Sequence, residues 1–147
     1  MSFTPPAVVE RLTSRLHRTI YRRSNGERGA SVGRSKRPVA LLTTTGRKTG
    51  ARREWPVLCL ATDDAFVVVA SNAGRDRHPA WYLNARANAA CELQLGPDRF
   101  LVTARDATED EARALWPRLH ELHPGFATYQ AKTRRKLPVV ILEPQAS

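Results

Sequence analysis

The sequence predicts an α+β fold that is mainly β, a small and partly closed antiparallel barrel of about six strands with helices packed around it. The first observation is a series of short apolar runs rich in β-branched residues, of which FVVVAS at residues 66–71 is the most continuous. The second is that several of these runs are joined by links of hairpin length, which connect antiparallel strands. The third is that strands and helices do not alternate regularly, which argues against a doubly wound parallel sheet.

The N-terminal part of the chain predicts a basic amphipathic helix over residues 5–23. Its apolar residues recur at three- and four-residue spacing, and arginines occupy the other side. Such a helix either docks on a domain or lies on an anionic membrane surface. Residues 24–37 are rich in Gly, Ser and Arg without periodicity and predict a linker. The chain is thus divided into a helix (1–23), a linker (24–37) and one domain (38–147).

The first half of the domain predicts three strands in succession. Val39–Thr45 (VALLTTT) is the first, and a turn at residues 46–50 with glycine at each end follows it. Residues 53–61 form the second strand, and the tight turn at 62–64 leads to the third strand at 66–71. The continuous apolar run of the third strand predicts burial on both faces.

The second half predicts a helix, a hairpin, two helices and a closing strand. The helix at 78–88 carries Pro79 in its first turn, where proline is tolerated. Strands at 91–95 and 100–105 form a hairpin across residues 96–98. Thr108 followed by Glu111 is a capping box that opens a helix ending near residue 120. A short helix at 124–134 and a strand at 137–142 complete the chain.

The net charge of the chain indicates which kinds of ligand or macromolecule it would bind. A net charge of +10 over 147 residues predicts attraction to polyanions, namely nucleic acid, anionic lipid or a phosphorylated or polycarboxylate ligand. The excess of arginine over lysine suits bidentate anion recognition, although a high-GC genome produces the same bias. Cys59 and Cys91 lack metal-binding spacing and predict buried free thiols. No metal site is expected. The sequence shows neither a secretory signal nor a membrane-spanning pattern, so the chain is expected to be cytoplasmic.

Two segments carry the functional signal. The turn at residues 46–53 holds Arg47, Lys48, Arg52 and Arg53 between glycines, which lets backbone amides and cations approach a phosphate or carboxylate. A solvated basic turn would have the same composition, and the spacing of a phosphate-binding P-loop is missing.

The second segment begins where a buried strand ends at Ser71. A turn at residues 72–74 leads to a helix start that carries Pro79 and Trp81. Unpaired N–H groups at a helix start suit a polar or anionic ring edge. Judged alone, Trp81 is more often a core residue than a ligand contact, and Asn84 could act as a hydrogen-bond anchor within the helix. Together, the two segments predict a site for a long, anionic, aromatic cofactor.

The motifs LLTTTGRKTG, VVVAS, HPAWYLN, LWP and LPVVILEP resemble those of the deazaflavin-dependent nitroreductase family. These are F-420-dependent quinone and nitro reductases of actinobacteria with a split β-barrel fold, and the resemblance covers residues 38–144. It implies that the phosphate and oligoglutamate tail of coenzyme F-420 is held by Arg47, Lys48, Thr49 and Arg53. It implies that the deazaflavin ring is bound by Trp55, Pro56, Val57, Ser71, Asn72, Ala73, Pro79, Ala80, Trp81, Tyr82 and Asn84.

The acceptor side departs from the family pattern. Relatives that reduce bulky nitro compounds carry several tyrosines, whereas the corresponding acceptor-binding positions here are Leu58, His123, Phe126 and Tyr129. The Ser-Lys-Gly-Gly turn of relatives is replaced by Ser-Asn-Ala-Gly at residues 71–74.

The implied reaction moves a hydride from reduced deazaflavin to a quinone, a nitro compound or an activated alkene. A proton must also reach the acceptor. Ser71 and Tyr129 are the candidate catalytic donors, His123 is a weaker one because imidazole titrates near neutral pH, and water is an alternative source.

The same sequence features also fit two other kinds of protein. A split barrel that binds FMN or haem would use the same basic turn for a single phosphate. A basic membrane-surface or nucleic-acid-binding protein would explain the net charge, although no nucleic-acid motif is present and specific nucleic-acid binding is not expected. The basic helix would also allow peripheral contact with a membrane that holds lipid quinones. Exposed strand edges favour pairing into a homodimer.

Overall fold

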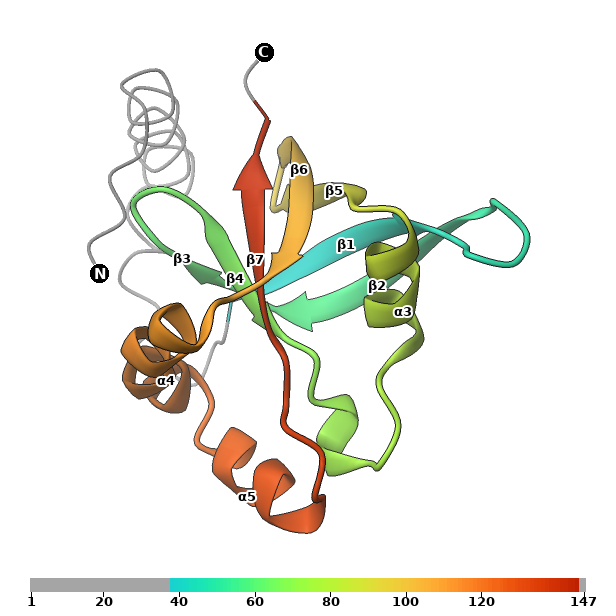
Figure 1. Ribbon diagram of the computed structural model, residues 1–147. Coiled ribbons are helices and arrows are strands. Elements are labelled where there is room, and N and C mark those ends of the chain that lie inside the picture. The colour runs from blue at the N-terminus through green and yellow to red at the C-terminus, as the bar shows by residue number, and fades with distance from the viewer. Residues whose placement is uncertain (1–37, 146–147) are drawn as a thin grey trace.

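The computed structural model describes residues 38–145, and it confirms the mainly β split-barrel architecture (Figure 1). Within these residues, one antiparallel sheet in the order β2-β1-β5-β6-β7-β4-β3 curls into an open half-barrel, with three α-helices around it. The helix predicted at 5–23 and the linker predicted at 24–37 lie outside the described residues. No helix within residues 38–145 combines the length and the apolar character needed to cross a bilayer.

The first hairpin provides one wall of the molecule. β1 (Val39–Thr45) pairs with β2 (Arg52–Leu58), and Leu42 stands opposite Trp55. The strand predicted at 53–61 is interrupted at Cys59, whose N–H donates to the Pro38 carbonyl at 3.0 Å. The chain then passes to the opposite edge of the sheet as β3 (Leu60–Ala61), which adds a short strand to the predicted set.

The remaining strands follow one another along the chain in the predicted order and complete the half-barrel. β4 is Phe66–Val69, β5 is Ala90–Leu95, β6 is Asp98–Asp106 and β7 is Val139–Pro144. β7 lies between β4 and β6, so the last strand of the chain joins the two halves of the sheet. β4 ends at Val69, two residues earlier than predicted, which leaves Ser71 outside the strand.

The helices agree with the predicted positions and differ at their ends. α3 (Ala80–Ala87) begins after Pro79, α4 (Glu109–Leu122) runs one half-turn further than predicted, and α5 (Gly125–Lys132) ends two residues earlier. A single 3₁₀ turn, η2 (Asn72–Gly74), follows β4. α4 and α5 cover one side of β4, and α3 covers the other end of the half-barrel (Figure 1).

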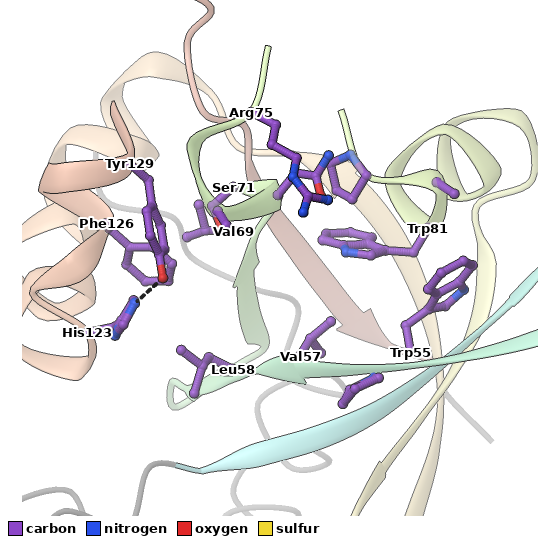
Figure 2. A pocket seen from close by; sticks show the side chains of 15 residues that line it. Trp55, Val57, Leu58, Val69, Ser71, Arg75, Trp81, His123, Phe126 and Tyr129 are labelled. Atoms are coloured by element: carbon purple, nitrogen blue, oxygen red, sulfur yellow. Dashed lines mark hydrogen bonds between the residues drawn. The ribbon is translucent and has the colours of Figure 1, made fainter. Parts of the chain in front are cut away.

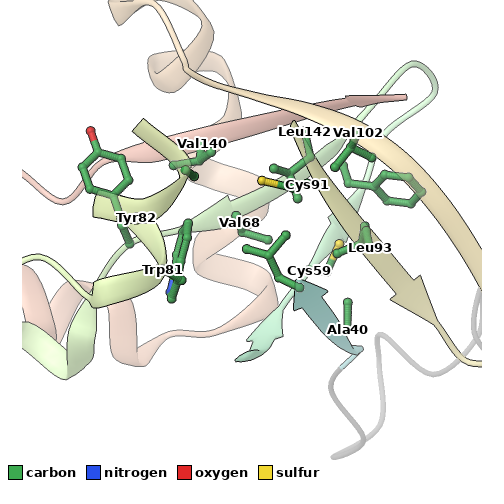
Figure 3. Packing of buried hydrophobic residues seen from close by; sticks show 14 of the residues in the cluster. Ala40, Cys59, Val68, Trp81, Tyr82, Cys91, Leu93, Val102, Val140 and Leu142 are labelled. Atoms are coloured by element: carbon green, nitrogen blue, oxygen red, sulfur yellow. The ribbon is translucent and has the colours of Figure 1, made fainter. Parts of the chain in front are cut away.

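Two hydrophobic clusters explain why the third predicted strand is apolar throughout. Phe66 and Val68 of β4 belong to the cluster inside the half-barrel, where Trp81 of α3 packs (Figure 3). Val67 and Val69 face the other cluster, beneath α4 and α5. Each successive side chain of a strand points to the opposite face, so a strand buried on both faces has no polar position.

Both thiols are free and buried, as predicted. Cys59 and Cys91 are 2% and 6% exposed, and burial raises the pKa of Cys59 to about 12 and that of Cys91 to about 11. A thiol reacts as its thiolate, so the two cysteines act as core residues.

The start of α4 carries the predicted capping box. Thr108 Oγ1 accepts from the Glu111 N–H at 3.1 Å, and Glu111 Oε1 accepts from the Thr108 N–H at 2.9 Å. Arg105 of β6 adds a forked ion pair to Glu111, with Nη1–Oε1 and Nη2–Oε2 distances of 2.7 and 2.8 Å, and binds Glu143 as well. The hydrogen bonds from Arg105 lower the pKa of Glu111 to about 2.

Replacing Glu111 by glutamine is expected to lower the free energy of unfolding by about 1 kcal/mol at pH 7. The ordinary pKa of 4.5 is depressed in the folded protein, so this stabilisation is full above pH 4.5 and is lost as the pH falls towards 2. Urea unfolding of both proteins at pH 7 and pH 3 measures the difference. Asp110→Asn, which affects the exposed pair with Arg113, is the control. An equal difference at both pH values would contradict the assignment.

Candidate functional site

An open pocket with a volume of about 450 Å³ lies where β2, η2, the start of α3 and the α4–α5 corner meet (Figure 2). Segments far apart in the sequence therefore share one cavity. Its lining consists of Trp55, Pro56, Val57, Leu58, Val69, Ser71, Asn72, Ala73, Arg75, Pro79, Ala80, Trp81, His123, Phe126 and Tyr129.

Most of the residues predicted from the sequence line this pocket. Those predicted for the ring and for the acceptor are brought together, with the exception of Tyr82 and Asn84. The residues predicted for the tail, Arg47, Lys48, Thr49 and Arg53, lie outside the lining. Val69 and Arg75 line the pocket and were not predicted. Alternation along β4 could have suggested Val69, but an exposed arginine in a loop carries no sequence signal.

The β2 wall presents an aromatic surface whose orientation is set by a buried hydroxyl. Trp55 Nε1 donates to Thr44 Oγ1 at 3.1 Å, and Thr44 is only 1% exposed. Figure 2 shows the indole rings of Trp55 and Trp81 on the same side of the pocket. Together with prolines at positions 56 and 79, they offer flat apolar surfaces suited to a planar ring.

The opposite wall is a backbone turn in a rarely populated conformation. Ser71 is right-handed with φ −80°, and the next three residues have positive φ values: Asn72 at 46°, Ala73 at 55° and Gly74 at 80°. A right-handed residue followed by a left-handed one turns successive N–H groups towards one side, which forms a concavity for anions. Asparagine and glycine tolerate this region, whereas Ala73 costs about 1 kcal/mol.

Arg135 holds this turn in place from the other end of the chain. Its guanidinium donates to the carbonyl oxygens of Ala70 at 3.2 Å, Ser71 at 2.7 Å and Arg75 at 2.7 Å. The same Nη1 lies 3.1 Å from His78 Nδ1, which must accept because arginine only donates. Burial and the Arg135 charge lower the pKa of His78, which keeps that nitrogen available as an acceptor.

The side of the pocket predicted to hold the acceptor is a cluster of three rings. Tyr129 Oη and His123 Nε2 are hydrogen-bonded at 3.3 Å, and Phe126 packs edge-on against His123 (Figure 2). η2 packs closely on this cluster, because a Cβ at Gly74 would lie 2.7 Å from the Tyr129 carbonyl oxygen. Gly74 therefore sets the spacing between Ser71 and Tyr129, the two predicted proton donors.

The basic turn between β1 and β2 is attached to α3. The Arg47 N–H and Nη1 both donate to Asn84 Oδ1, at 3.2 and 2.9 Å. Asn84 lies three positions after Trp81 on α3, so the turn is connected to the pocket through one helical turn. Asn84 is thus an anchor for the turn rather than a lining residue.

Two cations of this turn remain available for a ligand. Lys48 and Arg53 are exposed, and neither forms an ion pair within the part of the chain that the structure describes. Arg52 instead pairs with Glu92 at 2.6 Å. Thr49 shapes the turn, because its Oγ1 accepts from the Ala51 N–H at 3.2 Å.

Tyr82 faces away from the pocket. Its Oη donates to Asp106 Oδ1 at 2.8 Å, and its ring lies 4.8 Å from that of His78. Burial, followed by the hydrogen bond to Asp106, raises the pKa of Tyr82 to about 12. The phenol therefore connects α3 to β6 and supports the pocket from behind.

Comparison with known proteins adds independent information. The family model for F420H(2)-dependent quinone reductases matches residues 13–144. An F420H(2)-dependent quinone reductase of Mycobacterium tuberculosis is 40% identical over 132 residues, covering 87% of each chain. The solved structure of an F420-H2 dependent reductase (FDR-A) has a TM-score of 0.68 and 38% identity, and covers 73% of this chain and 95% of that chain. A second solved structure, described as a domain-swapped dimer, has a TM-score of 0.68 and 34% identity, covering 86% and 99%.

Proposed function

The chain belongs to the F420H(2)-dependent quinone reductase family, and we propose that it reduces a quinone held beside Tyr129 with a hydride from reduced coenzyme F-420. The chain is an enzyme, and coenzyme F-420 is its cofactor. This assignment takes precedence over FMN, haem and nucleic acid, the alternative ligands that the sequence left open. When bound, the reduced cofactor supplies the hydride, and the protein supplies binding, orientation and electrostatics.

The main support is the pairing of a flat, aromatic pocket with a cationic turn attached to the same helix. Trp55 and Trp81 offer faces for a planar ring, and the left-handed turn after Ser71 offers N–H groups for its polar edge. Lys48 and Arg53, which form no ion pair within residues 38–145, are cations placed to attract an anionic tail. This combination fits a ring, a phosphate and carboxylates in one ligand.

Titration with oxidised coenzyme F-420, followed by its fluorescence, tests the cofactor site. Binding tighter than about millimolar is expected, since a millimolar constant corresponds to only about 4 kcal/mol. The second stage mixes the protein and reduced cofactor with a water-soluble quinone, a nitroaromatic compound and an activated alkene in parallel. Absence of cofactor binding would remove the proposal. Turnover of the nitro compound or the alkene but not the quinone would redirect it to another acceptor.

The proposal includes the acceptor range. Leu58 and Phe126 give the acceptor side an apolar surface, and Tyr129 provides its phenol. We expect quinones to be preferred, and nitro compounds and activated alkenes belong to the range to be tested.

Tyr129 is the proposed proton donor because His123 orients its hydroxyl at the pocket wall. Tyr129→Phe is expected to lower kcat with a quinone about a hundredfold, the usual contribution of general acid catalysis, and to leave the affinity for oxidised F-420 unchanged. Ser71→Ala, measured in the same way, tests the other candidate. If Tyr129→Phe and Ser71→Ala both keep the wild-type kcat, the proton comes from His123 or from water.

We also propose that the protein forms a homodimer, as does the relative described as a domain-swapped dimer. Among the strands of residues 38–145, β2 and β3 are the two edges of the sheet, and edge strands present backbone groups with which a second copy can pair. Light scattering after size-exclusion chromatography would measure the mass, and a monomer at all concentrations would contradict the proposal.

A cytoplasmic location with peripheral membrane contact through residues 5–23 is a further part of the proposal, resting on their basic amphipathic pattern. Deletion of residues 1–23 should abolish binding to anionic liposomes. Equal binding by both forms would rule this contact out.

A further inference from the structure

We propose that Arg75 is the cationic contact for the polar edge of the deazaflavin ring, and that it favours the reduced form of the cofactor. This inference rests on the proposed function, because it assumes that the ring occupies the pocket between Trp55 and Trp81. It concerns a residue outside the resemblance to known family motifs.

The position of Arg75 is the first observation. It is the only arginine or lysine among the described residues that line the pocket. Figure 2 shows its side chain reaching into the space between Ser71 and Trp81, away from the ring cluster around Tyr129. Its charge therefore lies on the cofactor side of the pocket rather than on the acceptor side.

The second observation is that the backbone of Arg75 is fixed while its guanidinium is available. The Arg75 N–H donates to the Asn72 carbonyl at 3.1 Å, and the Arg75 carbonyl accepts from Arg135 Nε at 2.7 Å. Within residues 38–145, the Arg75 guanidinium has no ion pair or hydrogen bond. A cation on an anchored peptide reaches a ligand with less loss of conformational freedom than one on a mobile loop.

The third observation is the composition of the turn itself. Between Ser71 and Gly74 the turn carries no charged side chain. The Asn72 side chain donates to the Arg77 carbonyl at 3.0 Å and brings no charge. Arg75, three positions after Asn72, brings a positive charge to the same wall of the pocket.

The chemistry of the ring explains the preference for the reduced form. The pyrimidine edge of a deazaflavin carries carbonyl oxygens, which accept from the fork of N–H donors on a guanidinium. Reduction adds electron density to the ring system, and a fixed positive charge stabilises the more electron-rich state. Arg75 should therefore bind both redox forms and bind the reduced form more strongly.

The test compares Arg75→Gln with wild type and with Arg77→Gln, a matched change at an exposed arginine outside the pocket lining. Two ligands are titrated: complete coenzyme F-420 and the tail-less deazaflavin riboside analogue, each in oxidised and reduced form without oxygen. Arg75→Gln is expected to raise the dissociation constant of both ligands about tenfold, with the larger increase for the reduced forms. Arg75→Lys should recover part of the loss, and Arg77→Gln should match wild type. Equal thermal unfolding midpoints would show that all variants are folded.

Each other outcome overturns the inference. A loss confined to complete F-420 would place Arg75 at the tail, and equal losses for the two redox forms would remove the redox preference. If wild type binds F-420 and Arg75→Gln behaves like Arg77→Gln, Arg75 has no contact with the cofactor while the proposed function stands. If wild type binds no F-420, both proposals fail together.

Discussion

Replacing Gly74 by alanine is expected to lower the free energy of unfolding by about 3 kcal/mol and to displace α5 from the pocket. Two effects add at this position. Its φ of 80° is left-handed, which costs a residue with a Cβ about 1 kcal/mol. The new Cβ would also lie 2.7 Å from the carbonyl oxygen and 2.8 Å from the Cα of Tyr129, and these are backbone atoms that cannot rotate away. Urea unfolding measures the first result, and cofactor titration measures the second.

Gly50→Ala is the matched control, because it separates backbone conformation from space. Gly50 has a φ of 75°, but no atom lies within 4 Å of its added Cβ. We expect it to cost only about 1 kcal/mol, the conformational part alone. An equal loss of unfolding free energy in the two variants would show that η2 and α5 move apart at little energetic cost. The spacing between Ser71 and Tyr129 would then not depend on Gly74.

Removing two cations from the basic turn is expected to weaken coenzyme F-420 binding at least tenfold at low salt. The variant is Lys48→Ala combined with Arg53→Ala, which spares Arg47 and therefore the attachment of the turn to Asn84. The dissociation constant should also become less sensitive to ionic strength, since fewer charge–charge contacts remain to be screened. Titration at several salt concentrations measures both quantities.

A second double variant controls for net charge. Arg99→Ala with Arg113→Ala removes the same charge from side chains that are 69% and 76% exposed and lie outside the pocket lining. We expect its affinity and salt dependence to match wild type. If both double variants weaken binding equally, the cofactor responds to overall charge, and the turn holds no part of it.

Sequence patterns predicted local features well where the signal was itself local. The Thr108–Glu111 capping box appears as expected, because both partners lie within one helical turn. The continuous apolar run of β4 correctly predicted burial on two faces. The predicted strand at 53–61 was wrong at Cys59, because the change of sheet edge there depends on pairing with strands distant in sequence.

The roles of individual site residues were less predictable. Tyr82 and Trp81 are neighbours with similar sequence signals, yet one binds Asp106 behind the pocket and the other lines it. Asn84 has the predicted type for an anchor, but its partner Arg47 could be found only in the folded protein. Arg135 gave no signal at all, because its acceptors are carbonyl oxygens that any residue provides.

The sequence by itself determined the mainly β fold, the cationic turn and the aromatic helix start. Each of these depends on a local property, namely the periodicity of apolar residues, the placement of glycines or the charge of a short segment. Only the tertiary structure decided which of these side chains meet. Arg135 anchors a turn more than 60 residues away, and Gly74 sets the distance to Tyr129, through contacts that depend on strand register and helix packing. The same packing places Arg75, a loop residue, in the pocket, where we propose that it contacts the polar edge of the deazaflavin ring.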